Sequence, residues 1–276
     1  MKRHYRPNLS SSYRHNIRPD DAGWKYLSFS VSAVDAGQTV SANTGGQEIV
    51  IVPLVGIVTV TYGEAAHAIG RKDLFRELTD VVYLPPRTDY RIVATQPVEI
   101  ATGRAPASGK LPPRLIRRED MTASIRGDAN VKRGVNVLLD SDELTERLTV
   151  YEIRTPSGNW SSFPPHRHDA LDNSSYHEET YYYRLSPSDG FALQRIYSRD
   201  TDLDVAMTVQ DGDLVLIHEG YHPVVNAPGT NAYYLNFLAG EGRKIRAIND
   251  PRFHWVTEQW DGNPIQIPTV GVKYPS

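Results

Sequence analysis

Along most of the chain, apolar and polar residues alternate with a period of two. This period places successive side chains on opposite faces of an extended strand. The segments that show it are rich in Val, Ile, Thr and Tyr and are separated by Gly, Pro, Asp and Asn; they cover residues 24–31, 57–62, 81–84, 148–153, 191–197, 205–209, 214–217 and 233–238. Short strands at such spacing are typical of β sandwiches and barrels. We therefore expect an all-β fold with short helical turns at most.

A change of composition near residues 104–130 divides the chain. Small residues, prolines and basic residues gather there, as in connections between domains. The two halves also share a weak repeat, because residues 80–90 and 212–222 each combine an acidic turn, an apolar strand, a Pro or Gly turn and an aromatic or His residue. We predict two sandwich domains, with the first in residues 1–113 and a linker and the second domain in residues 114–276. The first lacks the histidines described below, so we expect it to bind no metal.

Composition and charge exclude several classes of protein. The 276 residues are 39% hydrophobic and 23% charged, which is typical of a globular chain. A formal net charge of −3 gives no reason to expect a nucleic-acid partner. The chain has no Cys, which excludes disulfides and thiolate chemistry. No signal peptide or membrane-length apolar run is visible, so we expect a cytoplasmic protein that does not enter membranes.

The residues that suggest chemistry lie in the second half. His166 and His168 are two positions apart, and residues i and i+2 of a strand share a face, so their imidazoles can converge. Such a pair can also be a plain surface feature. A carboxylate, either Glu178 or Glu179, and a third histidine, His222, follow on later predicted strands. These additions favour a metal site over a surface feature.

Three His and one carboxylate suit a divalent ion, with Zn²⁺ as the first expectation and Mn²⁺, Fe²⁺ or Ni²⁺ as alternatives. We favour Glu179 over Glu178 because Tyr181 and Tyr183 share the face of Glu179 on the predicted strand. The expected ligand set is therefore His166, His168, Glu179 and His222.

Several motifs resemble those of a known family. The cupin pattern has an HxH pair followed by Glu and Gly, then Gly, a strand, and His with Asn four residues later; the matching residues are His166, His168, Glu179, Gly190, Gly212, Gly220, His222 and Asn226. Two departures are a longer gap before Glu179 and His218 in place of a motif proline. Residues 164–169, 178–184, 190–197, 220–224 and 233–240 look like those of the 5-deoxy-glucuronate isomerases of myo-inositol catabolism. A related family is the 4-deoxy-L-threo-5-hexosulose-uronate ketol-isomerases.

The resemblance implies a bicupin whose second copy holds one divalent metal. It also implies the conversion of 5-deoxy-D-glucuronate to 5-dehydro-2-deoxy-D-gluconate through an enediol or enediolate. Such a reaction needs a general base, for which Glu178, His177 and Tyr182 are candidates beside a metal-bound hydroxide. The choice among them stays open at this point.

The implied substrate carries a carboxylate and hydroxyl groups. Arg184 and Arg195 are candidates for the carboxylate, because guanidinium groups bind carboxylates in bidentate fashion. Gln194, Tyr197 and Tyr221 are candidates for the hydroxyls. We expect Arg167 to point away from the ligand face.

Other interpretations use the same motifs. A cupin dioxygenase would carry Fe²⁺ in the same ligand set, a sugar-binding or regulatory cupin would have no turnover, and a storage-type bicupin would have no use for buried polar ligands. Exposed sheet edges pair readily between subunits, so we also expect a homo-oligomer.

Overall fold

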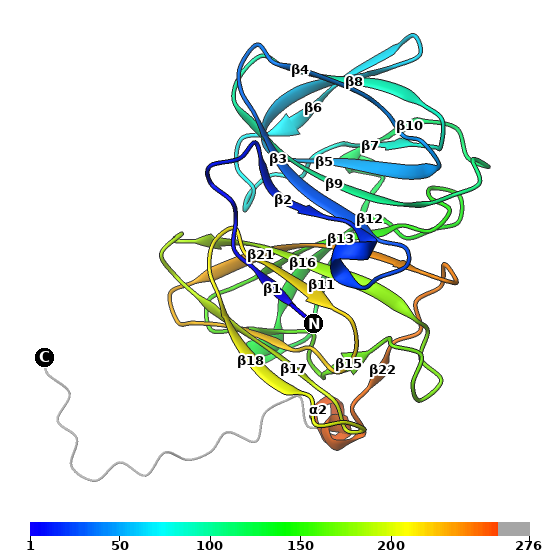
Figure 1. Ribbon diagram of the computed structural model, residues 1–276. Helices are drawn as coiled ribbons and strands as arrows, with labels where there is room; N and C mark the ends of the chain where they lie inside the picture. The colour runs from blue at the N-terminus through cyan, green and yellow to red at the C-terminus, as the bar shows by residue number, and fades with distance from the viewer. Residues whose placement is uncertain (259–276) are drawn as a thin grey trace, which may run out of the picture.

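The computed structural model describes residues 1–258, which form two β domains stacked one on the other (Figure 1). Regular structure is almost entirely strand, in agreement with the period-two pattern. The helical segments are short: α1 (Pro19–Ala22), η1 (Arg118–Asp120), η2 (Ala129–Val131), η3 (Pro251–Phe253) and α2 (His254–Glu258).

The first domain is a curled nine-stranded sheet. Its strands are β2 (Tyr13–Ile17), β3 (Ser28–Val34), β4 (Thr39–Asn43), β5 (Gln47–Tyr62), β6 (Ala65–Arg71), β7 (Val81–Leu84), β8 (Asp89–Ala94), β9 (Val98–Pro106) and β10 (Arg114–Ile116). The long strand β5 joins both halves of this barrel. Its first part pairs with β7 and β9 and its last part with β6 and β8, with a register shift between Pro53 and Val55.

The second domain contains a seven-stranded sheet in the order β1-β19-β16-β21-β13-β12-β11 and a four-stranded sheet in the order β14-β20-β17-β18. The short strands β15 and β22 pair with each other. The bounds are β1 (His4–Tyr5), β11 (Thr122–Arg126), β12 (Arg133–Leu139), β13 (Thr149–Thr155), β14 (Trp160–Ser161), β15 (His166–Arg167), β16 (His177–Ser186), β17 (Ala192–Tyr197), β18 (Asp204–Val209), β19 (Leu214–Ile217), β20 (Val224–Asn226), β21 (Asn231–Gly240) and β22 (Ile248–Asn249).

The largest apolar cluster lies between the two domains. It combines Phe29 and Tyr83 of the first domain with Tyr182 and Phe237 of the second. Gly103 makes the close approach possible, because a Cβ there would lie 2.0 Å from the ring of Phe237. Each barrel also has a separate apolar cluster of its own. The domains are therefore joined through a shared core.

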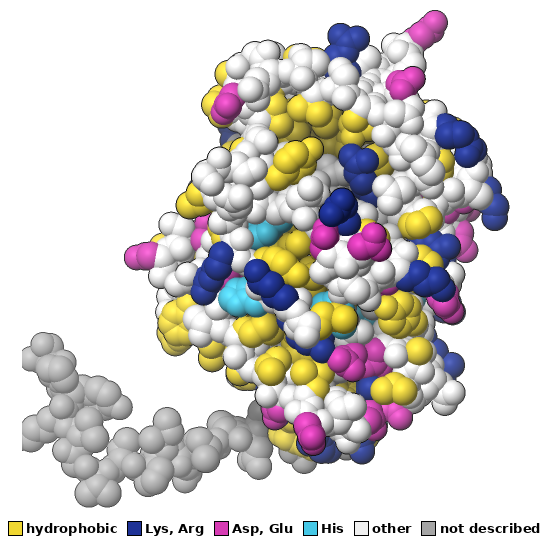
Figure 2. All heavy atoms as spheres, in the orientation of Figure 1, with side chains coloured by type: hydrophobic (Ala, Val, Ile, Leu, Met, Phe, Trp, Pro, Cys, Tyr) yellow, Lys and Arg dark blue, Asp and Glu magenta, His cyan; other side chains and the backbone are white. Residues whose placement is uncertain are grey.

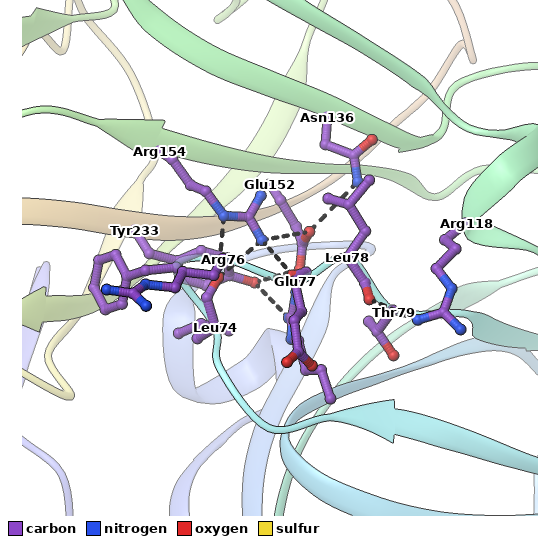
Figure 3. A network of polar contacts seen from close by, with 12 residues as sticks. Leu74, Arg76, Glu77, Leu78, Thr79, Arg118, Asn136, Glu152, Arg154 and Tyr233 are labelled. Carbon is purple, nitrogen blue, oxygen red and sulfur yellow. Dashed lines mark hydrogen bonds and ion pairs between the residues drawn. The ribbon is translucent and has the colours of Figure 1, made fainter.

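A buried ion-pair network crosses the same interface (Figure 3). Arg71 of β6 and Glu152 of β13 are fully buried and 2.5 Å apart, and Tyr233 donates its hydroxyl to Glu152 at 2.8 Å. Arg154 donates to the carbonyls of Leu74 and Glu77 in the first domain. A buried pair of this kind is stable only when its remaining donors and acceptors are satisfied, which these contacts achieve.

Two glutamates make matching contacts across the interface. Glu48 of β5 accepts hydrogen bonds from the backbone N–H groups of residues 146–148, each at 2.7 Å. Glu178 of β16 accepts hydrogen bonds from the backbone N–H groups of residues 25–27, at 2.6 to 3.0 Å. The two segments that donate these hydrogen bonds directly precede β13 and β3. Each domain therefore contacts the other through an equivalent glutamate.

The strands cross the domain boundary predicted after residue 113. β10, which starts at Arg114, pairs with β7 of the first domain, so the change of domain follows residue 116. At the other end of the chain, β1 pairs with β19 of the second domain. Short strands at the ends of a segment have too little pattern to reveal their partners.

The surface agrees with the near-neutral charge, because positive and negative side chains are interspersed on the face shown in Figure 2. Within residues 1–258, no helix has the length and apolar character needed to cross a membrane.

Candidate metal centre

The three histidines expected as ligands come together in the second barrel. His166 lies on β15, His168 follows that strand, and His222 lies between β19 and β20. One ring nitrogen from each lies within 4.8 Å of the others. The ring centroid of His222 is 4.7 Å from that of His166 and 5.1 Å from that of His168.

Glu179 completes the group from β16. Its Oε2 atom lies 2.9 Å from Nε2 of His168 and 3.3 Å from Nε2 of His222. The other carboxylate oxygen, Oε1, accepts a hydrogen bond of 2.8 Å from Asn236 on the neighbouring strand β21. One oxygen is thus held by the protein while the other faces the histidines.

Backbone carbonyls orient two of the imidazoles. Nδ1 of His168 donates to the carbonyl of His177 at 2.9 Å, and Nδ1 of His222 donates to the carbonyl of Gly220 at 3.0 Å. A carbonyl only accepts, so both rings carry a proton on Nδ1, and Nε2 is the atom that can bind a metal when it is deprotonated. Nε2 of His222 is buried and has no hydrogen-bond partner. An uncompensated nitrogen beside two imidazoles and a carboxylate fits a divalent metal.

Charge and burial within the group favour the metal-binding forms of Glu179 and His166. Burial would raise the pKa of Glu179, but its contacts with His168 and His222 hold that pKa well below its usual range. Burial and the two neighbouring histidines lower the pKa of His166 to about 3. Burial would lower the pKa of His168 too, but its hydrogen bond to Glu179 raises it. A neutral His166 and an ionised Glu179 are ready to act as ligands.

A cavity of about 200 Å³ opens beside this group. One wall is a face of the seven-stranded sheet, where Asn236 lies opposite both Tyr151 of β13 and Tyr181 of β16. The hydroxyl of Tyr181 is 2.8 Å from that of Ser162. Both residues line the cavity. The cavity therefore offers a small polar space next to the candidate metal.

Two of the three residues expected as general base lie on the opposite face of β16. Glu178 is fully buried at the domain interface, where residues 25–27 already take up both of its oxygens. Tyr182 packs against Phe29 and His15 of the first domain. Successive residues of a strand face opposite sides, so neither side chain lies on the face of β16 that carries the candidate ligand Glu179. We therefore remove both from the proposed site.

His177 lies beside the metal group without lining the cavity. Its ring centroid is 6.2 Å from that of His168, and its Nδ1 is 2.9 Å from the hydroxyl of Ser175. Burial and then His168 lower the pKa of His177 to about 4. The backbone carbonyl of this residue, which orients His168, is its clearest contact with the site.

The residues expected to bind substrate also lie outside the cavity. Arg184 pairs with Glu99 and Asp211, and Arg195 pairs with Asp204 on the outer sheet. The buried Gln194 accepts a hydrogen bond from Tyr183. Tyr197 donates to Asp250 and stacks on the buried ring of Tyr221. The sequence placed all of these residues except Tyr221 on strands, but it could not show which face of each sheet meets the cavity.

Arg167 points away from the ligands, as expected. It is buried and forms a bidentate pair with Asp169 at 2.7 and 2.8 Å. Asp169 in turn accepts the N–H of Gly220 at 2.7 Å, whose carbonyl orients His222. Through these contacts, Arg167 and Asp169 hold the backbone segment that orients His222.

The sequence analysis missed several lining residues, among them Arg126, Arg133, Tyr151 and Asn236. Arg126 lies in the segment near residues 104–130 that we interpreted as an interdomain connection, and Arg133 follows it closely. Residues 122–126 and 133–137 in fact pair as a β hairpin. The period-two pattern of residues 133–139 was an available signal for that strand. Tyr151 and Asn236 required knowledge of strand pairing, which no local pattern supplies.

Comparison with known proteins extends these observations over most of the chain. The 5-deoxy-glucuronate isomerase of Geobacillus thermodenitrificans is 40% identical over 247 residues, which cover 88% of this chain and 90% of that protein. The crystal structure of an IolB-like protein from Salmonella typhimurium superposes with a TM-score of 0.89 and 34% identity, and covers 93% of this chain and all of that one.

More distant structures show the fold alone. Oxalate decarboxylase of Lactobacillus farciminis matches 94% of this chain and 90% of its own with a TM-score of 0.66 and 11% identity, which confirms the expected bicupin architecture. The model of the KduI/IolB family matches residues 3–256. This chain therefore belongs to the KduI/IolB family.

Proposed function

We propose that this protein is an aldose–ketose isomerase that converts 5-deoxy-D-glucuronate to 5-dehydro-2-deoxy-D-gluconate. The observation that carries the proposal is the convergence of His166, His168, His222 and Glu179 beside a small polar cavity. The relative from Geobacillus thermodenitrificans, which bears the name 5-deoxy-glucuronate isomerase, supports the choice of reaction.

The four side chains would hold one divalent metal, with Zn²⁺ as the first candidate and Mn²⁺, Fe²⁺ and Ni²⁺ as alternatives. When bound, such an ion supplies a Lewis acid that polarises a carbonyl group. The protein's own part is to fix the imidazole orientations through the carbonyls of His177 and Gly220. Asn236 fixes the carboxylate of Glu179.

The cavity also holds a hydroxyl that can contact a sugar. Burial, with the charge of Glu179, raises the pKa of Tyr181 well above its usual value. The phenol therefore stays protonated at neutral pH and can donate a hydrogen bond to a substrate oxygen. Ser162, 2.8 Å away, can accept or donate and so keeps this hydroxyl oriented within the cavity.

The experiment follows ketose formation from 5-deoxy-D-glucuronate by NMR and measures metal content on the same sample. Conversion should stop after chelation and return when the metal is restored. His166→Ala should lower both bound metal and turnover by at least about a hundredfold, because a ligand contributes more than an outer contact worth 10 to 100-fold. His67→Ala, in the exposed β6 hairpin of the first domain, is the matched control and should change neither.

Metal-loaded protein without turnover would contradict the substrate assignment and direct attention to oxygen uptake, as in a dioxygenase. Turnover that survives complete removal of the metal would contradict the role given to the four ligands. The expected self-association stays a prediction: β18 ends its sheet within the described residues and exposes Val205, and light scattering of the purified protein measures it.

A further inference from the structure

Two arginines face each other directly at the cavity. Arg126 of β11 and Arg133 of β12 are register partners in an antiparallel hairpin, and both line the cavity beside His166 and Glu179. Like charges directly opposite on neighbouring strands repel and destabilise a sheet. The pair therefore costs free energy unless an anion lies between the guanidinium groups.

Neither arginine has a carboxylate partner among residues 1–258. Arg133 instead donates a hydrogen bond from Nη1 to the backbone carbonyl of Val131 at 3.0 Å. By contrast, Arg184 lies between Glu99 and Asp211. The two arginines at the cavity thus lack the carboxylate partners that Arg184 has in the same domain.

The lining of the cavity strengthens this contrast. Glu179 is its sole carboxylate within the described part of the chain, and that group is already engaged by His168 and His222. Arg133 is half-buried, and burial lowers its pKa from the usual value for arginine. A guanidinium in this position retains its charge and gains from an anionic partner, because its solvation is reduced.

The backbone of the hairpin holds the pair in place. Gly127 has a φ of 79° and a Cβ there would lie 2.3 Å from the carbonyl of Val131, so the chain turns tightly after Arg126. The short helix η2 then returns the chain to Arg133. The opposition of the two side chains is thus set by the turn rather than by the side chains themselves.

We propose that Arg126 and Arg133 form the subsite that binds the carboxylate of the substrate, an inference that rests on the proposed action on a uronate. A carboxylate between them removes the repulsion and accepts charge-assisted hydrogen bonds. It also anchors the end of the sugar that is remote from the reacting carbons, so that the aldehyde end lies toward His166 and Glu179. An anchor at this remote end acts in the ground state and in the transition state alike, so its loss should raise KM more than it lowers kcat.

The test uses metal-loaded protein and two non-reacting analogues of the substrate. In the acid analogue, C1 is reduced to an alcohol and the C6 carboxylate is kept; in the neutral analogue, C6 is also an alcohol. Calorimetry measures binding of both to the wild type, Arg126→Gln and Arg133→Gln. Lys132→Gln is the control, because Lys132 is exposed and pairs with Asp128 outside the cavity.

The wild type should bind the acid at least about tenfold more tightly than the neutral analogue, since a hydrogen bond to a charged group stabilises by about 1.5–3 kcal/mol. Each arginine variant should lose most of this preference, and KM for 5-deoxy-D-glucuronate should rise about tenfold or more while kcat changes less than about threefold. Lys132→Gln should behave as the wild type. Thermal unfolding of all variants verifies that they fold.

Folded arginine variants that keep the wild-type preference for the acid would overturn the subsite. The outcome for the reaction is separate. If the wild type binds the acid through these arginines but does not convert 5-deoxy-D-glucuronate, the subsite stands and the proposed isomerase activity fails. If the wild type converts the substrate and the arginine variants retain its KM, the activity stands and the subsite fails.

Discussion

The two barrels use the same strand positions for different purposes. In the second barrel, Glu179 lies opposite Ile217, where it faces the histidines. In the first barrel the corresponding strands place Ile49 opposite Leu84. The interior of the first barrel is filled by apolar side chains: Val34, Ile49, Ile51, Val58, Val60, Tyr62, Ile69, Val82, Leu84, Tyr90, Ile92, Ala94, Val98 and Ile100.

One residue earlier on each strand, the two barrels agree. Glu48 precedes Ile49 as Glu178 precedes Glu179, and each accepts three backbone N–H groups of the other domain. The outward face thus serves the domain contact in both copies, while the inward face decides whether a barrel is a packed core or a site. Three experiments test this division.

The largest effect should come from a carboxylate in the first barrel. Ile49→Glu buries a charge among apolar side chains without ligands or donors, which should lower the free energy of unfolding by about 3–5 kcal/mol. Chemical denaturation monitored by circular dichroism measures the loss. Ile57→Glu, on the same strand at a 40% exposed position, should cost less than about 1 kcal/mol. Equal losses at both positions would remove the contrast between inward and outward faces.

A smaller and equal effect should follow from loss of either interface glutamate. Glu48→Gln and Glu178→Gln each keep one acceptor oxygen but lose the charge, so each should destabilise by about 1–3 kcal/mol. Turnover by the folded, metal-loaded variants should stay within about twofold of the wild type. A folded Glu178→Gln variant with no turnover would restore this residue as a candidate general base. A large difference in destabilisation between Glu48→Gln and Glu178→Gln would show that the two glutamates do not have equivalent roles.

The smallest effect concerns a carboxylate that one copy alone carries. Glu146 occupies the position that Lys25 occupies in the first domain. Burial would raise the pKa of Glu146, but hydrogen bonds from Ser108 and the N–H groups of Gly109 and Lys110 lower it to about 2. A lowered pKa stabilises the fold above the unfolded value near 4.5 and loses that stabilisation as pH falls toward 2.

Solvent screening limits the stabilisation from Glu146 to below about 1 kcal/mol. Unfolding between pH 2 and 6 should therefore show a slightly shallower dependence for Glu146→Gln than for the wild type. The exposed Glu143→Gln is the control and should leave the dependence unchanged. An identical pH dependence for the wild type and Glu146→Gln would show that these hydrogen bonds contribute nothing in solution.

The sequence predicted which side chains form the candidate metal centre, because short motifs along the chain contain them. The HxH pair, Glu179 and His222 could be identified from motif spacing, and the strands from their alternation. The same alternation could have excluded Tyr182, since it lies three positions from Glu179 and must face the other side. That inference needed only the strand and not its neighbours.

The proposed carboxylate subsite and the domain contacts could not be predicted in this way. Arg126 and Arg133 become neighbours through a hairpin whose register depends on the turn at Gly127, and Glu178 gains its role from a segment about 150 residues away. Such pairings are tertiary properties. Composition alone led us to interpret the start of this hairpin as a connection between domains.

The pairing of β1 with β19 has a consequence for biosynthesis. His4 lies opposite Val215, and Arg6 and His4 both contact the buried Asp213. Because translation runs from the N-terminus, residues 4–6 are made well before the strand β19 with which they pair. A second domain expressed by itself would present the bare edge of β19 to other molecules, which favours aggregation. Residues 4–5 thus complete a sheet whose other described strands all follow residue 121.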